Sequence, residues 1–107
     1  MPATYIKDEA EFETLLTSES VFVVDCTATW CGPCRLVAPL IDQLAEEYGD
    51  RAKVFKLDLD ENKEIAKRYS IRSIPAVMFF KQGDVAETLI GKKSYEEYST
   101  ALSNHIA

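Results

Sequence analysis

The chain has 107 residues, of which 47% are hydrophobic and 28% are charged, and its formal net charge is −6. A chain of this length can bury more than half of the surface that its unfolded form exposes, so we expect a single domain over residues 1–107. The acidic balance argues against binding to nucleic acid or to anionic membranes, and no apolar run approaches the roughly 20 residues of a membrane span.

The hydrophobic pattern predicts five strands and four helices. In chain order these are a strand at 3–6, a helix at 8–19, a strand at 21–27, a helix from 33 to a stop at Gly49, a strand at 53–59, a short helix at 61–69, a hairpin of strands 76–81 and 85–90, and a helix at 94–106. Residues 21–27 are apolar nearly throughout, which is typical of a strand covered on both faces. Pro39 lies inside the second helix and is expected to kink it. The sum is an α/β protein with a mixed sheet and helices on both faces.

Two cysteines, Cys31 and Cys34, lie where the strand at 21–27 gives way to the long helix. The first N–H groups of a helix have no intrahelical partner and the peptide dipoles leave positive charge there, so a thiolate at that end is stabilised. The thiolate is the form that attacks disulfides. Residues three apart on a helix have Cβ atoms roughly 5–6 Å apart and a disulfide needs about 3.5–4.5 Å, so small adjustments open or close a bond between the two sulfurs. Pro33 is tolerated between them because a first-turn residue needs no N–H.

Two alternatives to a redox pair are a metal site and a structural disulfide. Zinc would need further ligands, but the chain has no second CxxC motif and only one histidine, His105. A disulfide that closes so short a loop would contribute only roughly 2 kcal/mol of stability. We therefore expect thiol–disulfide exchange and no metal. The third cysteine, Cys26, is expected to be a small buried hydrophobe.

The compartment is predicted from two observations. An odd number of cysteines, three, fits a reducing compartment better than a disulfide framework. Residues 1–20 lack the basic start and hydrophobic middle of a signal peptide. We expect a cytoplasmic location.

Several separated residues occur in this order of elements: Asp25, Trp30-Cys31-Gly32-Pro33-Cys34, Pro39, Lys56, Ile74-Pro75, Gly83 and Gly91. In this pattern the chain resembles the thioredoxin family over essentially its whole length. The resemblance implies the thioredoxin fold, a mixed five-stranded sheet with a three-stranded parallel part plus antiparallel strands, flanked by four helices. It also implies a general protein-disulfide reductase whose only redox group is the Cys31–Cys34 disulfide, with no cofactor.

The resemblance assigns catalytic roles to four residues. Cys31 would be the nucleophile and the more exposed sulfur, and Cys34 would be the resolving thiol that releases the product. Asp25, a carboxylate in an apolar strand, would have a raised pKa and would accept a proton from Cys34 through water, the alternative being a hydrogen-bonded structural role. Lys56 would lie near Asp25 and tune it, or would be an ordinary surface lysine.

A substrate-binding surface is also implied. X–Pro bonds are cis in only about 5–6% of folded cases, yet the resemblance predicts a cis bond between Ile74 and Pro75. In the family this proline faces the cysteines, and the backbone of the residue before it pairs with an extended segment of the substrate. The other expected contact residues, which complete a flat and mostly apolar patch, are Trp30, Gly32, Pro33, Ile90 and Gly91.

Four positions depart from the family pattern. Thr27 and Cys26 stand where the family often has aromatic residues, and Ser73 and Lys92 stand where small residues are frequent, which leaves the redox potential and the partner preference open. The expected partners are disulfide-containing target proteins and a thioredoxin reductase, NADPH- or ferredoxin-dependent, and the expected state is a monomer. The alternative functions are a thioredoxin-fold oxidant or isomerase and a redox-independent interaction subunit.

Overall fold

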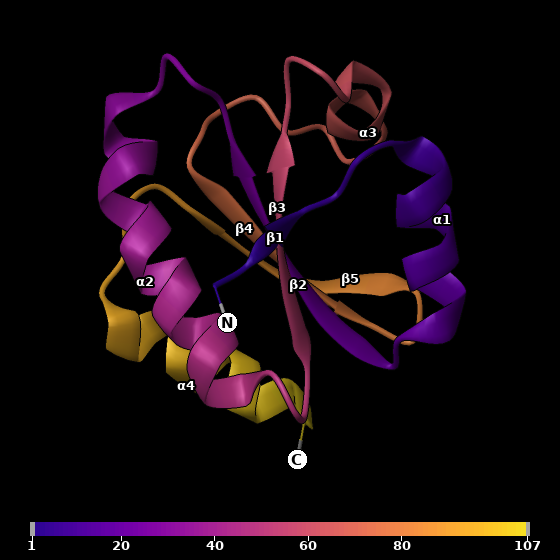
Figure 1. Cartoon of the computed structure of the whole chain (residues 1–107), viewed down its shortest axis with the longest axis vertical. Helices are drawn as coiled ribbons and strands as arrows, with labels where there is room; N and C mark the ends of the chain where they lie inside the picture. Colours follow the sequence, from indigo (N-terminus) through magenta and orange to yellow (C-terminus); the bar gives the residue numbers. More distant parts are fainter. Residues whose placement is uncertain (1, 107) are drawn as a thin grey trace.

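A mixed five-stranded sheet forms the centre of the molecule (Figure 1). The computed structural model describes residues 2–106. The elements in chain order are β1 (Thr4–Tyr5), α1 (Glu9–Ser18), β2 (Val21–Thr27), α2 (Gly32–Tyr48), β3 (Lys53–Asp58), α3 (Lys63–Arg68), β4 (Ala76–Lys81), β5 (Asp84–Ile90) and α4 (Tyr95–Ile106). The strand order is β1-β3-β2-β4-β5, with β1, β3 and β2 parallel and with β4 and β5 antiparallel to their neighbours. The predicted mixed sheet with a three-stranded parallel part is confirmed.

Side chains alternate along the central strand β2 and build a core on each face of the sheet. Val21 and Val23 pack with residues of α2 and α4, whereas Phe22 and Val24 pack with residues of α1 and α3. Figure 1 shows these two pairs of helices on opposite sides of the sheet. All residues of β2 except Thr27 are buried, as expected for a strand covered on both faces. The carboxyl end of this rigid strand leads into the cysteine segment.

Two helices begin one residue later than predicted, because the residue expected to come first is the N-cap. The Asp8 carboxylate accepts a hydrogen bond from the Glu11 backbone N–H at 2.9 Å, in front of α1. The Ser94 hydroxyl accepts a hydrogen bond from the Glu97 backbone N–H at 3.2 Å, in front of α4. Both side chains satisfy N–H groups that have no partner within the helix.

Helix α3 is shorter than the predicted segment 61–69. The Asp58 carboxylate accepts hydrogen bonds from the backbone N–H groups of Asp60 and Glu61 at 2.9 and 3.3 Å. This side chain holds the two residues in a turn, so the helix cannot start until Lys63. The turn also leaves Asp60 beside the cysteine segment, where it makes the contact with Trp30 described below.

The β4–β5 hairpin closes with a two-residue turn and not with the predicted loop 82–84. Gln82 and Gly83 both have positive φ, 53° and 84°, as a type I′ turn requires. The open end of the hairpin brings Ile90 opposite Ala76, the residue after Pro75. The hairpin therefore places two parts of the predicted substrate surface next to each other.

Helix α2 positions the cysteine pair. It runs from Gly32 to Tyr48 without a break, although Pro39 lies inside it. The kink expected at Pro39 stays a prediction. No helix in the described part of the chain, residues 2–106, is long and apolar enough to cross a membrane.

Candidate active site

The cysteine pair lies at the N-terminus of α2. Cys31 is the N-cap residue, and its sulfur accepts a hydrogen bond from the Cys34 backbone N–H at 3.3 Å. Cys34 lies in the first helical turn, and a disulfide joins the two residues with their Cα atoms 5.3 Å apart. The sulfur of Cys31 thus occupies the position at a helix N-terminus where negative charge is stabilised.

Burial does not distinguish the two cysteines. Cys31 is 4% exposed and Cys34 is 3% exposed, so the expected difference in exposure is almost absent. Both pack in a small cluster with Ala28 and the partly buried Ile74. What separates them is their place in the helix, since one caps it and the other lies within its first turn.

The segment Ile74–Pro75 lies against the cysteine pair. Its peptide bond is cis, as the resemblance predicted, and the Ile74 carbonyl oxygen is 3.9 Å from the Cys31 sulfur. The Pro75 carbonyl accepts a hydrogen bond from the Gly91 backbone N–H at 2.8 Å. Gly91 has a φ of 87°, a conformation that residues with side chains rarely adopt. Three segments that are distant in the chain therefore meet at the disulfide.

Exposed residues form a rim around this site. Trp30 is 68% exposed and Ile90 is 47% exposed, and Gly32 and Pro33 also lie at the surface. The Trp30 indole N–H donates a hydrogen bond to the Asp60 carboxylate at 2.9 Å, which fixes the ring. Large exposed apolar side chains are typical of a surface that binds another protein. Sequence reasoning did not single out Asp60, because no local pattern links it to a residue on another segment.

Asp25 is the buried carboxyl group of β2. It is 1% exposed, and within residues 2–106 its Oδ1 atom has no hydrogen-bond partner. Burial raises the pKa of Asp25 to about 7, with the Lys56 ammonium opposing the rise and the Asp42 carboxylate adding to it. A carboxyl group that titrates near neutral pH can both accept and release a proton under physiological conditions.

Lys56 lies beside Asp25 because the two residues are paired in the register of β2 and β3. Its ammonium forms an ion pair with Asp42 at 3.0 Å, and its side chain is 12% exposed, so it is not an ordinary surface lysine. The Asp42 carboxylate also accepts a hydrogen bond from the Ala3 backbone N–H at 3.1 Å. Sequence reasoning missed Asp42, whose partners are all on other elements.

The remaining candidates lie away from the disulfide. Cys26 is free and fully buried in the core on the α1 and α3 face. Burial, together with the nearby Asp25, raises the pKa of the Cys26 thiol to about 12, which keeps it protonated and unreactive at neutral pH. His105 forms a hydrogen bond with Glu87 at 3.0 Å. Within residues 2–106, no group of three or more His, Cys, Asp or Glu side chains is placed to hold a metal ion.

The site combines a disulfide at a helix N-terminus, a cis-proline that faces it and exposed apolar residues nearby. This combination defines a protein of the thiol–disulfide exchange class. Comparisons with known proteins agree. The sequence profile of the family described as Thioredoxin matches residues 3–104. The chain belongs to the thioredoxin family.

Individual relatives show how far the similarity extends. The chain is 42% identical over 90 residues to the thioredoxin of Bacillus subtilis, covering 84% of this chain and 86% of that protein. It is 50% identical over 102 residues to the M-type chloroplastic thioredoxin of Spinacia oleracea, covering 95% of this chain and 56% of that longer protein. The crystal structure of the Malassezia sympodialis thioredoxin superposes with a TM-score of 0.90 at 31% identity, covering 100% of this chain and 96% of that one. Family membership and the cysteine pair identify a protein-disulfide reductase that works by dithiol–disulfide exchange.

Proposed function

We propose that Cys31 is the attacking thiol and Cys34 the resolving thiol of a general protein-disulfide reductase. The observation that carries this assignment is the place of Cys31 as the N-cap of α2, where its sulfur accepts the Cys34 N–H. Partial positive charge at that end of the helix stabilises a thiolate on Cys31. Cys34 lies within the first turn, with its Cα 5.3 Å from that of Cys31, so the sulfur that it can reach is that of Cys31 itself.

The reaction consists of two exchanges of sulfur partners. In the first, the Cys31 thiolate attacks one sulfur of the target disulfide. A bond forms between them as the target bond breaks, and the other target sulfur leaves as a thiolate. In the second, Cys34 loses its proton and attacks the Cys31 sulfur, which forms the Cys31–Cys34 disulfide and releases the second target thiolate. Two electrons pass to the target, whose thiolates then take up protons.

Asp25 is the acceptor for the proton that Cys34 loses, with water relaying it. The support is a buried Oδ1 atom without a partner and a pKa of about 7. Lys56, placed beside Asp25, tunes this acceptor by favouring its charged form. A carboxylate held in a nearly dry site receives a proton readily, because the neutral form is the one that burial favours.

Target proteins bind as an extended segment along Ile74, with backbone pairing at the residue before the cis-proline. The contacts on either side of this segment are Trp30, Gly32, Pro33, Pro75, Ile90 and Gly91. Their support is the meeting of these segments around the disulfide and the exposure of Trp30 and Ile90. A mainly apolar rim accepts many sequences, which suits a general reductase.

The setting of the reaction completes the proposal. The protein acts as a cytoplasmic monomer of one domain, and a thioredoxin reductase returns electrons to its disulfide. The relatives include thioredoxins of bacteria and of chloroplasts. An NADPH-dependent and a ferredoxin-dependent reductase should therefore both be assayed as electron donors to the Cys31–Cys34 disulfide. Sedimentation of the reduced protein at increasing concentration tests the monomeric state.

Replacing the resolving cysteine tests the two-thiol mechanism. We expect the Cys34→Ser variant to lose nearly all turnover in an insulin-reduction assay and to accumulate a mixed disulfide through Cys31, because nothing releases the target. The matched control is Cys26→Ala, which removes a buried thiol of the neighbouring strand and should keep full turnover. Comparable turnover by Cys34→Ser and the unmodified protein would refute the mechanism. Target binding that survives replacement of both active-site cysteines would favour an interaction subunit instead.

A further inference from the structure

We propose that a groove beside the disulfide selects target segments in which a large apolar side chain is followed by carboxylates. This inference rests on the proposed function and adds a substrate preference to it. The groove lies between α2 and the segment that joins β5 to α4, and its volume is about 510 Å³. We call it the flanking groove. Its walls come from Leu36 and Leu40 on one side and from residues 92–95 and 97 on the other.

The floor and one wall of the flanking groove are apolar. Leu36, in one wall, is 60% exposed and therefore presents apolar surface to water. Leu40 and Tyr95 are partly buried and pack on the core beneath. The Tyr95 hydroxyl donates a hydrogen bond to the Glu47 carboxylate, which holds the ring in the wall. An aliphatic or aromatic side chain entering here would remove apolar surface of both partners from water.

Two lysines set the charge of the flanking groove. Lys92 and Lys93 follow Gly91 directly, and within residues 2–106 no carboxylate forms an ion pair with either of them. The one acidic lining residue, Glu97, has its carboxylate hydrogen-bonded to the Ser94 hydroxyl at 3.3 Å. Two unpaired ammonium groups on a chain of net charge −6 favour a target with carboxylates at this point.

Residues on both sides of the flanking groove are close in the chain to the active site. Leu36 follows Cys34 by two positions in α2, and the lysines begin immediately after Gly91, which is part of the predicted substrate surface. The lysine segment is also fixed in place, because the Lys93 backbone N–H donates a hydrogen bond to the hydroxyl of the buried Tyr98 at 3.2 Å. A target segment that passes Gly91 would therefore meet a groove already formed, with little loss of loop entropy.

Three synthetic peptides test the proposal. Each carries the same intramolecular disulfide and differs only in its flank, which is Leu-Glu-Glu, Leu-Lys-Lys or Ser-Glu-Glu. We expect the prereduced full-length protein to reduce the first about threefold or more faster than either of the others, since exposed charge pairs and one partly buried leucine each contribute factors of this order. The Lys92→Glu variant should reverse the order of the first two peptides, and Leu36→Ser should remove the advantage of leucine over serine.

A matched variant separates a local effect from net charge. Lys81→Glu makes the same change of charge at an exposed position at the far end of β4 from Pro75, and it should keep the order seen with the unmodified protein. An equal effect of Lys81→Glu and Lys92→Glu would overturn the proposal, and so would equal rates for all three peptides. Insulin, the substrate of the assay described above, distinguishes a failure of the flanking groove proposal from a failure of the proposed function. If the unmodified protein does not reduce it, the proposed function itself fails. If it is reduced and the peptides are not distinguished, only the flanking groove proposal falls.

Discussion

At the scale of single residues, Asp25 illustrates how a carboxyl group can serve a site whose reacting atoms are sulfurs. Three features set the pKa of Asp25. The residue is buried in the central strand β2, Lys56 lies beside it on β3, and Asp42 is supplied by α2. The Lys56 ammonium also forms an ion pair with Asp42, so it only partly offsets the effect of burial on the pKa of Asp25. The result is a proton acceptor that titrates near neutral pH in a core position.

Replacing Asp25 by asparagine should slow the second exchange and change its pH dependence. In the unmodified protein the carboxyl group loses its proton as the pH rises through about 7, so release of the mixed disulfide should accelerate over that range. In Asp25→Asn the rate should be lower by about 10²-fold near pH 7, as is typical when a general base is removed, and should rise only at the higher pH where Cys34 itself ionises.

Rapid mixing with a chromophoric disulfide measures this effect. The first exchange, attack by Cys31, is the internal control and should change much less than the second. Equal rates of mixed-disulfide release in Asp25→Asn and the unmodified protein from pH 6 to pH 9 would remove Asp25 from the mechanism and leave it a structural residue.

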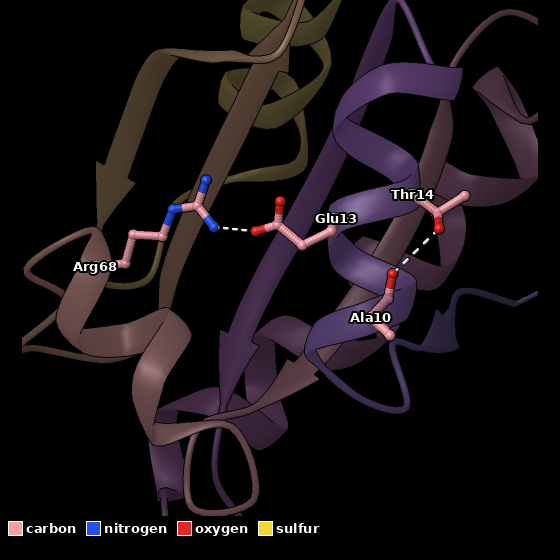
Figure 2. Close-up of polar contacts among 4 residues, drawn as sticks. All are labelled: Ala10, Glu13, Thr14 and Arg68. Atoms are coloured by element: carbon pink, nitrogen blue, oxygen red, sulfur yellow. Dashed lines mark hydrogen bonds and ion pairs between the residues drawn. The ribbon is translucent and has the colours of Figure 1, made fainter.

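At the scale of elements, helix α3 shows how a short segment is held by its neighbours. A helix of six residues is too short to be stable alone, so it depends on tertiary contacts. Figure 2 shows Arg68 of α3 reaching across to Glu13 of α1, with which it forms an ion pair. The Arg68 guanidinium also lies over the rings of Phe12 and Tyr69, with centroid distances of 5.8 and 5.4 Å. The contacts with Glu13 and Phe12 fasten α3 to α1 on the face of the sheet away from α2.

A double-mutant cycle should detect the contact between α1 and α3. Because both side chains are half-exposed, we expect Glu13→Gln and Arg68→Gln to show a coupling free energy of about 0.2–1 kcal/mol that decreases as salt is added. The measurement is urea unfolding of the four proteins at low and high ionic strength. Thr14→Val replaces Glu13→Gln in a control cycle and should show no coupling with Arg68→Gln. The Thr14 hydroxyl donates within α1 to the Ala10 carbonyl and does not contact α3 (Figure 2). A coupling free energy of zero at low salt would contradict a stabilising ion pair between Glu13 and Arg68.

Local patterns predicted most elements, and contacts between elements account for the differences. The 3.6-residue period predicted α2, and the cysteine motif at its start predicted the centre of the site. The start of α3 could not be predicted, because it depends on the Asp58 side chain capturing two N–H groups of a turn. Asp42 and Asp60 were missed for a related reason, since their partners Lys56 and Trp30 lie on other segments. The cis bond at Pro75 followed from the family resemblance alone.

At the scale of the whole molecule, a carboxyl group lies at the centre of a compact fold. The Cα radius of gyration is 12.3 Å, close to the roughly 13 Å of a compact chain of about 100 residues. Asp25 belongs to the central strand and cannot become solvated without disruption of the packing around it. The proton equilibrium of this single group is therefore linked to global unfolding.

Stability should fall as the pH rises from about 4 to about 7. The pKa of Asp25 is about 7 in the folded protein against an ordinary value of 3.8, so between these values the unfolded chain releases a proton that the folded protein keeps. Below pH 4 both states are protonated and no penalty applies, whereas above pH 7 the folded protein bears the full cost of a buried charge. At 1.36 kcal/mol for each pKa unit, this cost is about 4 kcal/mol.

The Asp25→Asn variant isolates the cost of the buried charge, because asparagine keeps the shape of the side chain and does not titrate. Urea unfolding of the oxidised proteins should give the variant a free energy of unfolding higher than that of the unmodified protein by up to about 4 kcal/mol at pH 8, and the advantage should disappear near pH 4. Asp50→Asn, at a side chain that is 86% exposed, is the control and should show no such pH dependence. An advantage of equal size at both pH values would mean that the amide acts through packing, and that the Asp25 carboxyl group does not titrate differently in the folded and unfolded chains.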